Sequence, residues 1–381
     1  MCTASDALKA VREANEPLPR HAWRTALAAR RAPLVADGVI RAVLLGTAGG
    51  SNPKSTRSGY SNAVVVGDAA YVVDCGEGAH RQMWRAGIGL NPNFDRSRPQ
   101  VKAIFLTHLH GDHIVDLPNF FMGSWPPNPV DVYGPAPAGL PIPRFPPDLV
   151  APMIYPDEPT PGTRAALDHM LRAFAYNVNL RVLDEGRMDV TQSVRVHEIG
   201  VRRDGFVPDI DLGVAAGASS KQAASPDMEP VIVYPEDEHG VTVSAILVQH
   251  APVFPALGYR FDTPAGSVVF SGDTGECPNI ARLARDADVL VHEILDIGPL
   301  TERIMRQPNG EQVLNHLASS HSSAEQVAAH AKAAGVRQVV LSHLVPGDFE
   351  FSEDAWESRV RAGYDGEVLC GVDLDELALD R

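Results

Sequence analysis

The sequence predicts an α/β protein in which two β-sheets are sandwiched between helices. Two separate stretches of the chain contain short apolar runs bounded by Gly, Asp and Asn, which is the pattern of buried strands. Each stretch is followed by segments with helical patterning, and there is no internal repeat with a period of about 20–50 residues. The 381 residues include 44% hydrophobic and 21% charged residues, so the chain can build a core and is not disordered as a whole.

Residues 1–38 are predicted to form a helical extension of a larger domain that spans residues 39–381. The extension is interrupted at Pro17 and Pro19, and we expect it to serve packing or oligomerisation. It lacks the uninterrupted apolar segment of a signal peptide, and no apolar run of about 18 residues follows it. The four cysteines form no C-x-x-C pair, which favours a reducing compartment. We therefore expect a cytoplasmic protein with no membrane contact.

The first stretch is expected to contain four strands, at 39–46, 62–67, 69–76 and 101–108. The second stretch begins near residue 230 and is expected to contain strands, a helix and two late strand-like segments. The strands are predicted at 230–235, 241–250, 257–263, 267–273 and 287–295, the helix at 322–335, and the late segments at 336–343 and 367–379.

Between the two stretches, residues from about 135 to 235 are predicted to form an insertion or lid. Prolines are dense from Pro118 to Pro161, which argues against sheet interior and predicts a long, stiff excursion. The spacing of apolar residues predicts one amphipathic helix over 163–178. Residues 213–229 have the composition of a linker or flexible loop, for which a lid and a disordered segment are the two alternatives.

The strongest chemical signal is the segment THLHGDH at 107–113, which directly follows an apolar strand. Its ligand-type side chains are His108, His110, Asp112 and His113, and the turn at Gly111 can aim them into one concavity. His108 and His110 are two apart on an extended segment, so they point to the same side. Asp112 and His113 follow the turn and can face a second ion.

Three further candidate ligands occur in the same local setting. His250, Asp273 and His343 each stand at the C-terminal end of an apolar strand. Because binding sites of layered α/β proteins assemble at strand ends, this repeated placement is typical of a composite metal site. One tetrahedral zinc ion cannot accept so many ligands, so two ions are indicated.

These residues match the pattern His-x-His-x-Asp-His, followed by SGDT at 271–274 and LSH at 341–343, and the chain resembles the metallo-β-lactamase superfamily. More narrowly, it resembles the ribonuclease Z and arylsulfatase-like branch. That resemblance rests on LGTAGG (45–50), VVDCGEGAHRQM (72–83), QHAPVFPALGYRF (249–261), VHEIL (291–295) and SSHSSAEQVAAHA (319–331). It implies an αββα four-layer sandwich, here with a proline-rich insertion, whose catalytic domain spans residues 39–381.

The resemblance also implies a dinuclear site with a complete set of ligands. One ion would take His108, His110 and His250, the other Asp112, His113 and His343, and Asp273 would bridge the two. Zinc is favoured, with manganese and iron(II) as alternatives. Because His110 stands where di-iron flavoprotein relatives have glutamate, and no flavin domain follows, hydrolysis is preferred over redox chemistry.

Two ions about 3.5–4 Å apart can lower the pKa of a bridging water, which would produce a hydroxide nucleophile. By resemblance, His321 would donate a proton to the leaving group, Glu293 would orient His321, and Asp112 would orient the hydroxide. Asp74 is expected to hold the first ligand loop by hydrogen bonds. Of the other histidines, His292 is predicted to be a core or supporting residue. His316 and His330 are predicted to be solvated helix positions.

The predicted substrate is a small organic ester, such as an aryl sulfate, a phosphodiester or a lactone. Only 22 residues separate His250 from Asp273, which leaves no room for the RNA-gripping arm of transfer-RNA-processing relatives, and the net charge of −15 disfavours nucleic acid as a partner. Phe120, Phe121 and Trp125 are expected to cover the site and form an apolar pocket with the proline-rich run; an oligomer interface is the alternative. A ribonuclease Z-like phosphodiesterase and a catalytically silent metal-binding or interaction protein are the two alternative functions.

Overall fold

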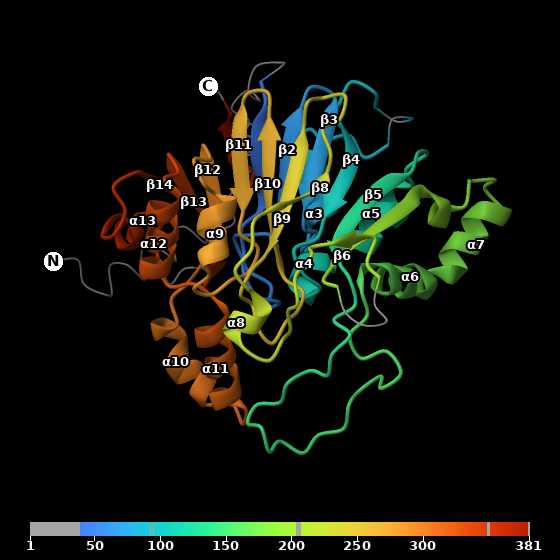
Figure 1. Ribbon diagram of the computed structural model, residues 1–381. Helices are drawn as coiled ribbons and strands as arrows, with labels where there is room; N and C mark the ends of the chain where they lie inside the picture. The colour runs from blue at the N-terminus through green and yellow to red at the C-terminus, as the bar shows by residue number, and fades with distance from the viewer. Residues whose placement is uncertain (1–38, 92, 94, 203–206, 349–350, 380–381) are drawn as a thin grey trace, which may run out of the picture. The chain divides into compact units, whose positions relative to one another are not determined.

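Two β-sheets pack face to face and carry helices on their outer faces, as the computed structural model shows (Figure 1). The structure describes residues 39–91, 93, 95–202, 207–348 and 351–379. The predicted helical extension, residues 1–38, lies outside the described residues. The arrangement confirms the predicted αββα sandwich.

The first sheet has eight strands in the order β15-β1-β2-β3-β4-β5-β6-β7. Their bounds are β1 (Arg41–Gly46), β2 (Ser61–Val66), β3 (Ala69–Val73), β4 (Gln100–Phe105), β5 (Val130–Pro135), β6 (Val194–Gly200), β7 (Ile210–Asp211) and β15 (Glu376–Ala378). The pairs from β15 to β3 are antiparallel, and those from β3 to β7 are parallel.

The second sheet has seven strands in the order β14-β13-β12-β11-β10-β9-β8. Their bounds are β8 (Val231–Tyr234), β9 (Thr242–Leu247), β10 (Leu257–Thr263), β11 (Gly266–Phe270), β12 (Val289–Leu295), β13 (Gln338–Val345) and β14 (Glu367–Cys370). Strands β11 to β14 are parallel, so their carboxyl ends meet at one edge. The predicted ligands lie at that edge, after the carboxyl end of β9 and after the carboxyl end of β4.

Two hydrophobic clusters hold the layers together. One contains Ala42 and Leu44 of β1 and extends through Phe105 into the second sheet. The other contains Val43 and Leu45 of β1 and packs the first sheet against its helices. Because successive strand residues point to opposite faces, one strand serves both clusters, which explains why β1 is buried along its whole length.

The helices lie in two groups. The helices beside the first sheet are α3 (Ala79–Arg85), α4 (Gly111–Ile114), α5 (Leu117–Ser124), α6 (Thr163–Ala173), α7 (Ala175–Leu183) and the 3₁₀ turn η1 (Val190–Ser193). The later helices are α8 (Lys221–Ala224), α9 (Pro278–Leu283), α10 (Gly298–Met305), α11 (Gly310–Ser320), α12 (Ala324–Ala334) and α13 (Glu353–Arg361). Within the described residues, no helix is long and apolar enough to cross a membrane.

Three expectations for residues 118–235 are wrong. The proline-rich stretch contains β5, a buried interior strand, because its prolines flank the strand and do not interrupt it. The helix predicted over 163–178 is two helices, α6 and α7, which meet at Phe174. The linker-like segment 213–229 packs Ala218, Ala224 and Met228 into the core, so the disordered alternative for it is wrong.

Asp373 lies between β14 and β15, and its carboxylate accepts hydrogen bonds from two other segments of the chain. Its Oδ1 accepts hydrogen bonds from the backbone N–H and the hydroxyl of Thr47, at 3.0 and 2.8 Å. Its Oδ2 accepts from the Ser58 N–H at 2.6 Å and from the Gln82 amide at 3.0 Å. The loop after β1, helix α3 and the C-terminal segment therefore share one anchor.

Replacing Asp373 by alanine should lower the free energy of unfolding by about 2–4 kcal/mol, because several donors lose a charged acceptor. Urea unfolding followed by circular dichroism would measure this. The matched control is Asp365→Ala, which removes an exposed carboxylate nearby. Equal stability of the two variants would contradict the anchoring role.

Candidate metal centre

The seven predicted ligands come together at the carboxyl edge of the two sheets. One group consists of His108, His110, His250 and Asp273, and a second of Asp112, His113 and His343. Within each group the ligand atoms lie within 4.8 Å of one another. The first sheet supplies the four residues that follow β4, and the second sheet supplies the other three. No other part of the chain has to move to assemble the cluster.

Local backbone geometry presents Asp273 to both groups. Gly272 precedes it with φ 60°, and a Cβ there would lie 2.7 Å from the carbonyl oxygen of Leu257. Only glycine allows the chain to pass at this point. Asp273 Oδ1 then lies 3.4 Å from His113 Nε2 and 3.3 Å from His343 Nε2. Its Oδ2 lies 3.8 Å from His108 Nε2 and 3.9 Å from His250 Nε2, so each oxygen faces one group.

Hydrogen bonds orient two of the imidazoles. Nδ1 of His113 donates to Asp74 Oδ2 at 2.9 Å, and Nδ1 of His250 donates to the Ser320 carbonyl at 2.9 Å. Asp74 also accepts from the N–H and the hydroxyl of Thr107, which fixes the start of the ligand loop. The predicted loop-holding role of Asp74 is confirmed. In both histidines Nε2 remains for coordination, the usual arrangement behind a metal-ligating imidazole.

The donor set fits divalent cations. Nε2 of His113 and Oδ1 of Asp273 are buried and make no hydrogen bond, a costly state unless a cation shares them. Burial lowers the pKa of His108 and His250 well below the ordinary value, so both imidazoles are neutral and can offer a lone pair. Imidazole nitrogen and carboxylate oxygen suit zinc, and also iron or manganese.

Asp112 is held from both sides. Its Oδ2 accepts from the Gly50 N–H at 3.0 Å and lies 3.4 Å from His343 Nε2. Burial raises the pKa of Asp112, but the hydrogen bond and charge of His343 and the charge of His113 outweigh burial and lower it overall. Asp112 therefore remains a carboxylate, as both a ligand and a water-orienting group require.

His321 and Glu293 form a buried pair beside the ligands. Nδ1 of His321 lies 2.9 Å from Glu293 Oε2, and Glu293 Oε1 accepts from the Thr274 N–H. The His321 ring stacks on that of His343, with centroids 5.8 Å apart. Burial lowers the pKa of His321, but the charge and hydrogen bond of Glu293 outweigh burial and raise it to about 9. The pair therefore favours the protonated imidazole, with Nδ1 facing Glu293 and Nε2 not engaged by it.

A second pair of buried histidines, His292 and His330, lies in this region, and the sequence analysis did not predict the burial of His330. His292 is buried, which confirms it as a core histidine. His330 is 6% exposed, so its assignment as a solvated position is wrong. The Cys277 N–H donates to His330 Nε2, which directs the Nδ1 proton of His330 to His292 Nε2 at 3.0 Å. The apolar neighbours Val327 and Ala331 on α12 were the available sign that this face is buried.

Two further expectations, the solvated position of His316 and the aromatic cover over the site, are wrong. His316 is half-buried and faces the cluster, with its ring 6.0 Å from His110 and 5.9 Å from His250, so it is not a solvated position. Phe120, Phe121 and Trp125 do not cover the site, because they pack in the core beneath the first sheet. Their helix α5 turns inward after the ligand loop.

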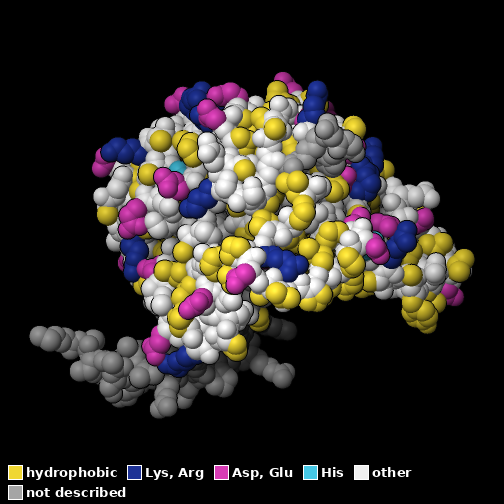
Figure 2. Space-filling model, turned by 60° about the horizontal axis from the view of Figure 1, so that its bottom comes forward, with side chains coloured by type: hydrophobic (Ala, Val, Ile, Leu, Met, Phe, Trp, Pro, Cys, Tyr) yellow, Lys and Arg dark blue, Asp and Glu magenta, His cyan; other side chains and the backbone are white. Residues whose placement is uncertain are grey.

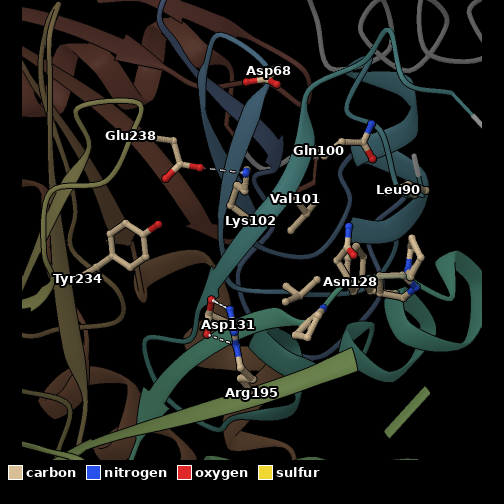
Figure 3. A pocket seen from close by; sticks show the side chains of 15 residues that line it. Asp68, Leu90, Gln100, Val101, Lys102, Asn128, Asp131, Arg195, Tyr234 and Glu238 are labelled. Carbon is tan, nitrogen blue, oxygen red and sulfur yellow. Dashed lines mark hydrogen bonds and ion pairs between the residues drawn. The ribbon is translucent and has the colours of Figure 1, made fainter. Parts of the chain in front are cut away.

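A separate pocket lies at the opposite, amino ends of β4, β5 and β6 (Figure 3). Lys102 pairs with Glu238 at 3.2 Å, and Arg195 pairs with Asp131 at 2.7 Å. No histidine lines this pocket. Its charges are matched in pairs, so it offers no reactive group and is distinct from the candidate metal centre.

Comparison with known proteins places the fold and the cluster in a family. Residues 56–149 match the metallo-beta-lactamase superfamily, and residues 227–344 match the beta-lactamase superfamily domain. Ribonuclease Z of Mycolicibacterium gilvum is 30% identical over 337 residues, covering 88% of this chain and 95% of that protein. Ribonuclease Z of Mycobacterium avium is 29% identical, covering 90% and 99%. The crystal structure of human tRNase Z, short form, has a TM-score of 0.54 at 18% identity, covering 90% and 100%.

The class defined by this fold and these matches is that of the metallo-hydrolases of the metallo-β-lactamase superfamily. Within the superfamily, the chain belongs to the ribonuclease Z family. The predicted resemblance and the predicted hydrolase class are both confirmed.

Replacing Asp74 by asparagine should weaken binding of divalent metal by about 10–100-fold, because one amide oxygen cannot accept from both the Thr107 N–H and His113 Nδ1, and the charge that favours this His113 tautomer is lost. Zinc competition with a chromogenic chelator would measure the change, with Asp365→Asn as the control. Unchanged zinc affinity would show that the Asp74 bond does not support coordination.

Proposed function

We propose that this protein is a dinuclear-metal phosphodiesterase that cleaves RNA, as the name of its ribonuclease Z relatives implies for them. The observation that carries the proposal is the His321–Glu293 pair, which stands 3.9 Å from Asp273 beside two complete groups of ligand side chains. A phosphodiester needs charge stabilisation on its oxygens and a proton for the leaving alkoxide. The cluster and the pair would divide these tasks between them.

The roles of individual residues follow from the contacts. The two groups of ligands would hold two divalent cations, with zinc favoured and Asp273 shared. When bound, the cations would supply Lewis-acid activation of the phosphoryl oxygens and of the attacking water. Asp112 would orient that water, His321 would donate the proton from Nε2, and Glu293 would keep His321 charged and aligned.

The relatives favour RNA over the small ester that the sequence alone predicts. The β10–β11 hairpin fills the interval between His250 and Asp273, which agrees with the absence of an RNA-gripping arm there. This absence and the net charge of −15 argued against nucleic acid, but they are weaker evidence than similarity along most of the chain to proteins named ribonuclease Z. A catalytically silent protein is disfavoured by its membership of a hydrolase family.

We also propose a cytoplasmic, reducing location, because Cys75, Cys277 and Cys370 are all free and buried. Residues 39–381 would form the catalytic domain, with residues 1–38 as an extension. Self-association through the exposed apolar side chains of the 135–183 region is part of the same proposal.

The test is turnover of a precursor transfer RNA by the zinc-loaded protein, run beside bis(p-nitrophenyl) phosphate, p-nitrophenyl sulfate and an aryl carboxylate ester. We expect cleavage of the RNA and of the phosphodiester, with loss of both activities after chelation. Turnover restricted to the sulfate or the carboxylate ester would overturn the proposal.

His321→Ala should keep bound zinc and lose about 10²–10⁴ in rate on substrates with poor leaving groups. Nitrophenolate departs readily without a proton, so hydrolysis of bis(p-nitrophenyl) phosphate should suffer much less. Paired rate measurements and metal analysis would check this. Equal losses on both kinds of substrate would mean that His321 positions the substrate and does not protonate it.

Glu293→Gln should reproduce the leaving-group pattern of His321→Ala in a milder form, because the amide still contacts the imidazole but no longer favours its charged form. The same paired rates would measure it. A larger defect than that of His321→Ala, or a loss of zinc, would contradict a purely orienting role.

A further inference from the structure

An apolar pocket of about 500 Å³ lies directly beside the candidate metal centre. Its wall comes from the ligand loop, from the segment after β5, from the end of the proline-rich run, and from the turn after His250. Lining residues include Leu109, Leu140, Ile142, Val253, Phe254 and His316. Figure 2 turns this side of the molecule toward the viewer and shows hydrophobic side chains gathered over it.

The pocket and the metal centre share residues. His110 belongs to the first group of ligands and also lines the pocket. His316 lines the pocket, and its ring lies 5.9 Å from that of His321. A molecule in the pocket would therefore contact His110 and lie close to the proposed proton donor.

The wall is chemically uniform. His110, His316 and Thr160 are the only polar side chains among the lining residues, and none of these lining residues is Lys, Arg, Asp or Glu. A nucleic-acid backbone needs cationic side chains along its path, which this wall does not offer. An aromatic or branched alkyl group, by contrast, gains from leaving water here. The volume falls in the range of about 300–1,000 Å³ that is typical of small-molecule sites.

Prolines give the pocket a fixed shape. Five of the lining residues are prolines: Pro135, Pro141, Pro161, Pro252 and Pro255. Each ring fixes its own φ, so the wall loses little conformational entropy when a ligand binds. Ala136, Ala138 and Ala218 leave the space between them free. The segment from 135 to 235 therefore contributes a preformed surface to the site.

We propose that this pocket binds the apolar ester group of a small organic phosphodiester while the phosphate lies at the metal centre. The proposal rests on the proposed phosphodiesterase function and adds a substrate class to it. A single aryl ring or a compact alkyl group fits the volume, and the phosphate would meet His110 at the inner end. Polar diesters and RNA would use the metal centre without entering the pocket.

Binding of two phosphonates tests the pocket without any turnover. Phenylphosphonate and methylphosphonate carry the same anionic group and differ only in the apolar substituent. Calorimetry on the zinc-loaded protein should find phenylphosphonate bound at least ten-fold more tightly. Ile142→Asp, which places a carboxylate on the wall, and Leu140→Trp, which fills the space, should each remove most of that preference.

The matched control is Ile154→Asp, which changes an exposed isoleucine of the same proline-rich segment that does not line the pocket. It should leave the ten-fold preference intact. Equal affinity of the two phosphonates for the unmodified protein, no binding of either, or an equal effect of Ile142→Asp and Ile154→Asp would overturn the pocket assignment.

Turnover of bis(p-nitrophenyl) phosphate by the same samples separates this proposal from the function on which it rests. No phenyl preference in the unmodified protein, with turnover retained, would refute the pocket alone. A phenyl preference without turnover of any phosphodiester would refute the proposed function and leave an apolar ligand site. In Ile142→Asp, kcat/KM for bis(p-nitrophenyl) phosphate should fall at least ten-fold, mainly through KM, while RNA cleavage stays unchanged.

Discussion

The candidate metal centre depends on hydrogen bonds that cross from one sheet to the other at their carboxyl ends. The Leu257 N–H donates to the Thr107 carbonyl at 2.9 Å, and the Tyr259 hydroxyl donates to the Leu106 carbonyl at 2.9 Å. On the other side of the cluster, the Leu344 N–H donates to the Thr47 carbonyl at 3.0 Å. Because each sheet supplies part of the ligand set, these bonds fix the relative position of both parts before any cation binds. A metal site requires its ligand atoms to be held at closely defined distances, and these bonds preorganise the two parts of the ligand set in that way.

Where the two sheets meet, three carboxylates of the candidate metal centre are buried, and this burial determines its electrostatics. Asp74, Asp273 and Glu293 are 0%, 2% and 1% exposed, and burying a carboxylate is costly unless hydrogen bonds or opposite charge offset the cost. Asp74 and Glu293 each have their own imidazole partner, whereas Asp273 Oδ1 has only imidazole edges around it. An unsatisfied carboxylate oxygen therefore lies where the two groups of ligands meet. Cations bound there would offset its cost, and metal binding would then be coupled to folding.

Sequence reasoning could bring these side chains together because its signals are local. THLHGDH follows β4, His250 and Asp273 follow β9 and β11, and His343 lies near the end of β13, so strand-level reasoning is enough to place them at one edge. Features that depend on packing between distant segments were not predictable in this way. His330 is buried against Cys277 and His292, which are far away in sequence. Phe120 and Phe121 of α5 are buried in the core beneath the first sheet. For β5, proline content misled because prolines beside a strand and prolines within one look alike in a composition count.

The two sheets carry the candidate metal centre, whereas the 135–235 region lines the pocket beside it, so the two parts would affect substrate specificity in different ways. Under the proposed function, the strand ends would form a platform whose charge stabilisation and protonation suit phosphodiesters of many kinds. The loops that connect the strands would determine which substrates can bind beside the strand ends. The sequence of such loops can change without disturbing the strands. In this chain the proline-rich loop runs from β5 to α6, and α6 packs on both β5 and β6. A loop anchored in this way at both ends would hold a wall of fixed shape beside the candidate metal centre, where a free loop of the same length would have to be ordered by each substrate.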